Sequence, residues 1–115
     1  MAQVTHAQAS SMVRMWKPKA VANPFSSEVL GNCEDVATLA HPGEGYRVAV
    51  TFAKVQGHPE WVRVRATNWR CEDEPNGVYA AEEGRAFYKR LLAAGFVAER
   101  VCSEGYMRNP NVEEN

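Results

Sequence analysis

The residues best suited to chemistry lie at alternate positions of one predicted strand, residues 61–70 (WVRVRATNWR). Successive side chains of a strand point to opposite faces of its sheet. One face therefore collects Trp61, Arg63, Arg65, Thr67 and Trp69. A guanidinium over an indole gains roughly 0.5–2 kcal/mol from cation–π attraction. Such a face can stack bases and hold phosphates, or bind an acidic, aromatic patch on another protein, since Trp and Arg are common interface anchors.

A second predicted strand, residues 46–55 (YRVAVTFAKV), would lie beside the first and leave room for large side chains. Its positions on the same face are occupied by Arg47 and three small residues, Ala49, Thr51 and Ala53. The opposite faces of the two strands are apolar. They carry Val48, Val50, Phe52, Val62, Val64 and Ala66. The alternation predicts a hairpin with one core face and one Trp/Arg face.

Two further features bear on binding. Residues 46–70 carry five bases and one acid, whereas residues 71–84 carry five acids and no base, among them Glu72, Asp73 and Glu74. This separation can orient the encounter with a partner, or the two neighbouring surfaces can neutralise each other. Residues 1–34 form an alternative cover for the Trp/Arg face, because Met12, Met15 and Trp16 need an apolar surface to pack on.

The clearest helix lies in the stretch from Val78 to Phe96 (VYAAEEGRAFYKRLLAAGF), which contains the sequence Ala-Glu-Glu near its start. Its apolar residues fall in one arc at 100° per residue and its charges in the opposite arc. Phe87, Leu91 and Ala94 would cover the apolar face of the hairpin. Gly84 lies at the centre of the apolar arc, which predicts that helix and sheet approach each other most closely there.

These elements predict an α+β fold. A small antiparallel β-meander of three to four strands, from residues 35–40, 46–55, 61–70 and 96–102, packs on one long C-terminal helix. The domain organisation expected is an irregular N-terminal arm (1–34), a core domain (35–102) and a polar tail (103–115). A chain of 115 residues suits one domain.

Catalysis and metal binding find little support. His6, His41 and His58 are isolated in the sequence, and Cys33, Cys71 and Cys102 form no CxxC pair. The acidic run at 72–74 lacks the spacing of a calcium loop, and the phosphate-binding glycine motifs are absent. The prediction is therefore no metal, no cofactor and no catalytic residue, with a reducing cytoplasmic location and no membrane span.

Residues 46–95, three strands and then a helix with the local sequence GVYAAEEGRAFY, are similar in element order to the small DNA-reading sheets of AP2-type domains and integrase arm-binding domains. The resemblance implies that basic strand residues enter a groove of nucleic acid, and here these would be Arg63 and Arg65. The net charge of −1 and the acidic residues at 72–74 depart from that pattern.

The sequence therefore favours a non-catalytic protein that docks on another protein through the Trp/Arg face or the acidic loop. The partner-binding residues would be Trp61, Arg63, Arg65, Trp69, Arg47, Glu72, Asp73 and Glu74. A nucleic-acid-binding module that uses the same face is the first alternative. A small-molecule-binding protein or minor enzyme, with a pocket between the arm and the sheet, is the second.

Overall fold

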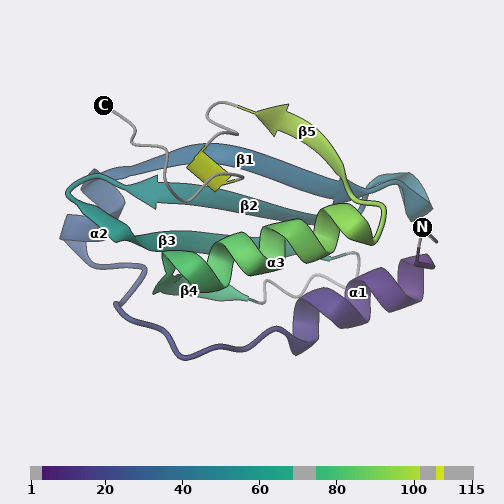
Figure 1. Ribbon diagram of the computed structural model, residues 1–115, viewed down its shortest axis with the longest axis horizontal. Helices are drawn as coiled ribbons and strands as arrows, with labels where there is room; N and C mark the ends of the chain where they lie inside the picture. Colours follow the sequence, from purple (N-terminus) through teal and green to yellow (C-terminus); the bar gives the residue numbers. More distant parts are fainter. Residues whose placement is uncertain (1–3, 69–74, 102–105, 108–115) are drawn as a thin grey trace.

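The computed structural model describes residues 4–68, 75–101 and 106–107 (Figure 1). In chain order its elements are α1 (His6–Met15), α2 (Ser27–Gly31), β1 (Cys33–His41), the 3-10 turn η1 (Gly43–Gly45), β2 (Val48–Val55), β3 (His58–Thr67), β4 (Asn76–Ala80), α3 (Ala81–Ala93) and β5 (Val97–Val101). The strands form one antiparallel sheet in the order β4-β3-β2-β1-β5. Helices α1 and α3 pack into one core with this sheet.

The β2–β3 hairpin has the predicted register. Phe52 pairs with Val64 and Val50 with Ala66, and these side chains are buried in the main core cluster together with Phe87 and Leu91 of α3. Arg63 and Arg65 alternate with the buried positions and therefore lie on the other face. The α+β class and the face assignment are confirmed.

Gly84 marks the close approach of α3 to the sheet, as the sequence predicts. A Cβ atom built on Gly84 would overlap Cγ1 of Val62, whose side chain belongs to β3. Only glycine leaves room for this valine, so the backbone of α3 can rest directly on the strand. The helix has 13 residues, which is an ordinary length.

The sheet differs from the predicted meander in two ways. Residues 76–77 were expected in a loop but begin β4, which pairs with β3 (Arg65 opposite Asn76). The last strand, β5, crosses to the far edge and pairs with β1 instead of extending a meander. The sheet therefore has five strands. Helix α3 follows β4 directly, and its N-cap residue, Ala80, provides no side-chain hydrogen bond.

The N-terminal segment is more regular than an irregular arm. The side chain and backbone of Thr5 form a capping box with Gln8, which starts α1. One face of this helix buries Ala9 and Val13 in the main core. Trp16 then stacks on Phe87, with ring centroids 4.3 Å apart and planes 4° apart. The alternative in which Trp16 covers the Trp/Arg face does not hold, because Trp16 lies on the side of the sheet that α3 covers.

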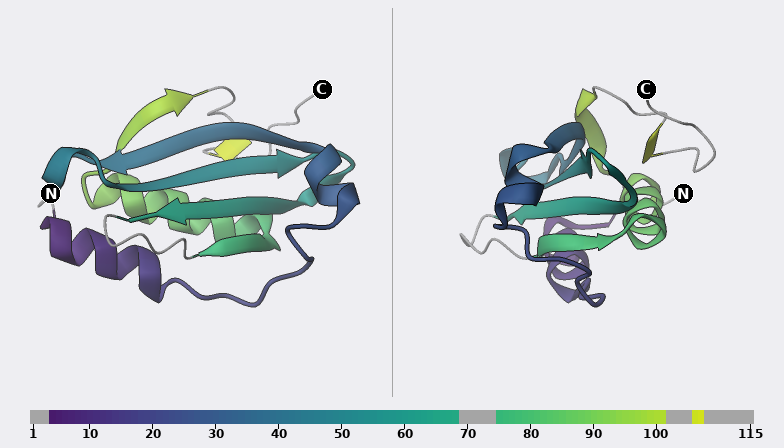
Figure 2. Two further views of the ribbon diagram at one scale, coloured as in Figure 1. Left: turned by 180° about the vertical axis from the view of Figure 1, so that it is seen from behind. Right: turned by 90° about the vertical axis from the view of Figure 1, so that its left-hand side faces the viewer.

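The rest of the N-terminal segment reaches the other side of the sheet at one end. The backbone N–H of Val21 donates to Val78 O of β4 (2.7 Å), and that of Gln56 donates to Asn32 O (2.7 Å). Between these anchors, Val29 of α2 joins a second small core with Val55 and Val78. Figure 2 (left) shows α2 at one end of the sheet. Among the described residues, no helix is long and apolar enough to cross a membrane.

Candidate functional site

Most of the sheet face opposite α3 carries no helix; α2 covers one end (Figure 2, left). Cross-strand pairing aligns its side chains in two rows. One row runs through Thr38, Thr51, Arg65 and Asn76 on β1, β2, β3 and β4. The next row runs through Asp35, Ala53, Arg63 and Val78. We call the polar members of these rows together with Thr67 the arginine face: Asp35, Thr38, Thr51, Arg63, Arg65, Thr67 and Asn76.

The arginine face contains a shallow hollow of about 370 Å³. It is lined by Thr51, Arg63, Arg65, Ala66, Thr67 and Asn76. The small residues of β2 leave this space, because Thr51 and Ala53 pair with the much longer side chains of Arg65 and Arg63 on β3. Among the described residues, the lining offers guanidinium, hydroxyl and amide groups. These groups can donate hydrogen bonds to an anion.

Arg65 crosses β2 to reach an acid on β1. Its Nη2 lies 3.3 Å from Oδ1 and 3.5 Å from Oδ2 of Asp35. The Arg65 and Asp35 side chains are about half and one third exposed. Such a long, solvent-exposed pair contributes little to stability, so a competing anion can displace Asp35 at small cost.

Arg63 has no such partner. It makes no hydrogen bond or ion pair with any residue in the described ranges, and its Nε is buried without an acceptor. The terminal Nη groups are not among the buried, unpartnered atoms of the described residues. The Arg63 side chain is thus half-buried, with its Nε enclosed.

Trp61 takes a different role from the one predicted. Its ring stacks on His58 with centroids 3.9 Å apart and planes 8° apart. It also packs on the second small core of Val29, Val55 and Val78. The backbone carbonyl of Trp61 accepts a hydrogen bond from the hydroxyl of Tyr106 (3.1 Å). Trp61 therefore helps to hold α2 on the sheet rather than lying flat over the small residues of β2.

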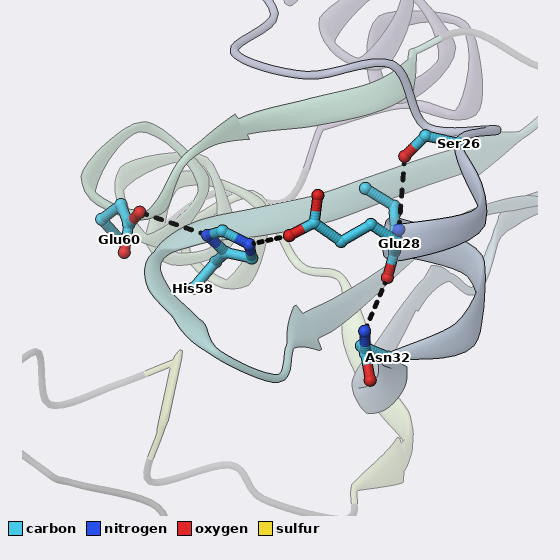
Figure 3. Close-up of polar contacts among 6 residues, drawn as sticks. Ser26, Glu28, Asn32, His58 and Glu60 are labelled. Carbon is cyan, nitrogen blue, oxygen red and sulfur yellow. Dashed lines mark hydrogen bonds and ion pairs between the residues drawn. The ribbon is translucent and has the colours of Figure 1, made fainter.

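His58 connects the β2–β3 turn to α2 (Figure 3). Its Nε2 is 2.6 Å from Oε2 of Glu28, and its Nδ1 is 3.5 Å from Oε2 of Glu60. The hydrogen bond to Glu28 raises the pKa of His58 above 6.5, and Glu60 adds to this, against the opposing effect of desolvation. Glu28 is itself held by α2, whose N-cap is the Ser26 hydroxyl and whose last turn is capped by the side chain of Asn32.

The remaining predicted residues are not gathered at the hollow. Arg47 is exposed just before β2 and is absent from the lining. Trp69, Glu72, Asp73 and Glu74 lie outside the described residues, as do Cys71, Cys102 and most of the predicted polar tail.

His58 and His41 each contact other groups of the fold in the described ranges. The two carboxylates near His58 contact different ring nitrogens, so one ion cannot bind both together with His58. His41 is buried, and its Nδ1 accepts a hydrogen bond from the Gly43 N–H (3.1 Å) while its Nε2 donates to Val4 O (2.9 Å). No cluster of three or more His, Cys, Asp or Glu residues suits a metal among the residues searched. Cys33 is a free thiol.

Three members of the arginine face were missed from the sequence: Asp35, Thr38 and Asn76. Asp35 and Thr38 lay inside the predicted strand 35–40, but which face each joins depends on a bulge between Asp35 and Ala37. Asn76 was assigned to a turn, and only its pairing with Arg65 reveals its place.

No family model matches the chain, and neither the curated proteins nor the solved structures contain a match.

Proposed function

We propose that this protein is a non-catalytic binding module that docks on another protein through the arginine face. The observation that carries the proposal is the position of Arg63 and Arg65, side by side on a sheet face that neither α1 nor α3 covers. Arg is enriched among the anchor residues of protein interfaces. Small neighbours on β2 give a partner's side chains access to both guanidinium groups.

A binding role fits the hollow better than an enzymatic one. A hydrolase or transferase needs a nucleophile activated by a base, or an acid–base pair, close to the substrate. The six described residues that line the hollow supply hydrogen-bond donors and two threonine hydroxyls, and the nearby carboxylate of Asp35 is paired with Arg65 rather than with a hydroxyl. These groups can orient and hold a ligand, which is what docking requires.

A protein partner also fits better than nucleic acid. Binding to single strands combines a basic groove with aromatic rings on which bases stack. On this face the nearby indole of Trp61 is engaged with His58 and α2, and Asp35 places a negative charge beside Arg65. The chain as a whole has a net charge of −1. A polyanion would gain little from such a surface.

The test compares protein capture from native lysate by three forms of the full chain, with and without nuclease, by quantitative mass spectrometry. The forms are the wild type, the Arg63→Ala/Arg65→Ala double variant, and the control Lys19→Ala/Lys89→Ala. The control removes the same charge from exposed sites outside the arginine face. Partners should be retained by wild type and control, lost by the arginine variant, and unaffected by nuclease.

Two results would count against this function. An identical set of captured proteins for wild type and arginine variant would exclude the arginine face as the docking surface. Capture that disappears with nuclease would favour the nucleic-acid alternative, and its affinity should then fall steeply with rising salt.

A further inference from the structure

We infer that the hollow beside Arg63 is a subsite for a single carboxylate, the side chain of an Asp or Glu on the partner. The inference rests on the docking function proposed above and names the chemistry that the partner must present. It depends on three properties of the arginine face: the state of Arg63, the net charge of the face and the neighbouring donors.

Arg63 is prepared to bind an anion. Its Nε is buried, and its two Nη groups have no partner among the described residues. A side chain that is partly buried before binding loses less conformational entropy when a ligand orders it. Two parallel N–H groups of a guanidinium match the two oxygens of a carboxylate. Partial desolvation further strengthens the attraction.

The net charge of the face favours a carboxylate over a phosphoryl group. Its described charged side chains are Arg63, Arg65 and Asp35, which together carry one positive charge. A carboxylate would neutralise this charge. A phosphoryl group carries about −1.5 to −2 at neutral pH, so it would leave an excess of negative charge next to Asp35.

Uncharged donors complete the subsite. The hydroxyls of Thr38 and Thr51 lie 3.0 Å apart and share one hydrogen bond, which uses one of their two protons. The second proton is available to a ligand oxygen. The Thr67 hydroxyl and the Asn76 amide line the same hollow, so a carboxylate bound to Arg63 can receive further hydrogen bonds from one or more of these groups.

The experiment follows the arginine side-chain resonances of the full-length protein by NMR during titration with defined probes. The probes are a capped Gly-Glu-Gly-Glu-Gly peptide, the same peptide with Gln for Glu, inorganic phosphate and a short single-stranded oligonucleotide. The Glu peptide should shift the Arg63 signals saturably, and the Gln peptide should not. Backbone amide spectra report whether each variant remains folded.

Variants separate the effect of the planar guanidinium geometry of Arg63 from the effect of its charge. Arg63→Ala should weaken binding of the Glu peptide by about tenfold or more. Arg63→Lys keeps the charge but removes the planar guanidinium group, so it should lose most of the wild type's affinity for the Glu peptide. Lys89→Ala is the matched control and should bind as the wild type does. Asp35→Asn removes the competing carboxylate from Arg65 and should strengthen binding.

Several outcomes would overturn the inference. Equal shifts with the Glu and Gln peptides would exclude a carboxylate subsite, and tighter binding of phosphate or the oligonucleotide would assign the hollow to a phosphoryl group. If capture from lysate depends on the two arginines while the Glu peptide leaves Arg63 unshifted, docking stands and the carboxylate subsite fails. If the Glu peptide binds but capture is unaffected, the docking function fails instead.

Discussion

Nε2 of His58 lies 2.6 Å from Oε2 of Glu28 and thereby joins the β2–β3 turn to α2, a helix about thirty residues earlier in the chain. The stacked ring of Trp61 and the Nδ1 contact with Glu60 fix the imidazole from two other directions. The N-terminal segment that covers one end of the sheet is therefore attached through a group that titrates near neutral pH.

The first prediction concerns the pH dependence of this attachment. The pKa of His58 is higher in the folded protein than its ordinary value of 6.5, chiefly because of the hydrogen bond to Glu28. The resulting stabilisation is complete below about pH 6.5 and is lost as pH rises through the raised value. The Tm of the wild type should exceed that of Glu28→Gln at about pH 6, and the difference should shrink towards about pH 9.

Two controls accompany this measurement. Glu60→Gln should show a smaller change with pH, because its carboxylate is 3.5 Å from the ring rather than 2.6 Å. Glu82→Gln changes an exposed acid on α3 and should leave the pH dependence of the wild type intact. A difference between wild type and Glu28→Gln that stays constant over the whole range would refute the assignment.

The second prediction concerns the contact between α3 and β3. Gly84→Ala introduces a Cβ that overlaps Cγ1 of Val62. Overpacking costs about 1–3 kcal/mol, and the better helix propensity of Ala offsets up to about 1 kcal/mol of that cost. We expect a net fall in the free energy of unfolding of up to about 3 kcal/mol in urea titrations.

A double variant tests the cause. Val62→Ala should destabilise the wild type by leaving a cavity, but should cost less in the Gly84→Ala background, because it removes the overlapping methyl groups. Gly31→Ala is the control, since a Cβ at that position meets no atom within 4 Å. Additive effects of the Gly84 and Val62 changes would show that the two residues do not limit each other.

The third prediction compares two neighbouring residues at the end of α1. Trp16 is 6% exposed and stacks on Phe87, whereas Met15 is 77% exposed. Trp16→Ala should lower the free energy of unfolding by about 3–5 kcal/mol. Met15→Ala should change it by no more than about 0.5 kcal/mol. Similar values for the two variants would mean that α1 is not anchored in the main core.

The fourth prediction concerns the hydroxyl of Tyr106, which donates to the Trp61 carbonyl at 3.1 Å. Tyr106→Phe keeps the ring in place but removes this donor. We expect a loss of about 0.5–1.5 kcal/mol in chemical unfolding. Tyr46→Phe serves as the control because Tyr46 is 47% exposed. An unchanged stability for Tyr106→Phe would assign the contribution of Tyr106 to ring packing alone.

The parts of the fold that the sequence predicted correctly are those with strong local patterns. The alternation in β2 and β3 fixed which side chains are buried, and the helical arc around Gly84 fixed the face that α3 turns to the sheet. Both patterns arise because a residue's direction in a strand or helix depends only on its position in that element.

The parts that were missed depend on contacts between distant segments. Asn76 and Gly77 follow a proline and resemble a turn, yet β4 forms because β3 supplies its hydrogen-bonding partner and the Tyr79 ring fits over Gly77. The partial burial of Trp61 depends likewise on the return of α2 to the sheet. Neither relation has a local signature.

Helix α1, by contrast, had a signal that sequence reasoning overlooked. Thr5 and Gln8 have the spacing of a capping box. Apolar residues then follow at Ala9, Val13 and Trp16, with a helical repeat. The polar residues around them gave the segment the composition of a loose arm.

At the arginine face, the types of the key side chains were predicted, but the pairing of Arg65 with Asp35 required the register across three strands.

The contacts of Tyr106 have a consequence for synthesis of the protein. Its carbonyl accepts a hydrogen bond from Nε of Arg85 (2.8 Å), and the next residue, Met107, is completely enclosed by the core. A nascent chain emerging from the ribosome can pair β2 with β3 early, but this part of its interior stays open until residue 107 has left the exit tunnel. Closure of the core should therefore wait for the segment around Met107 and should not accompany the early pairing of β2 with β3.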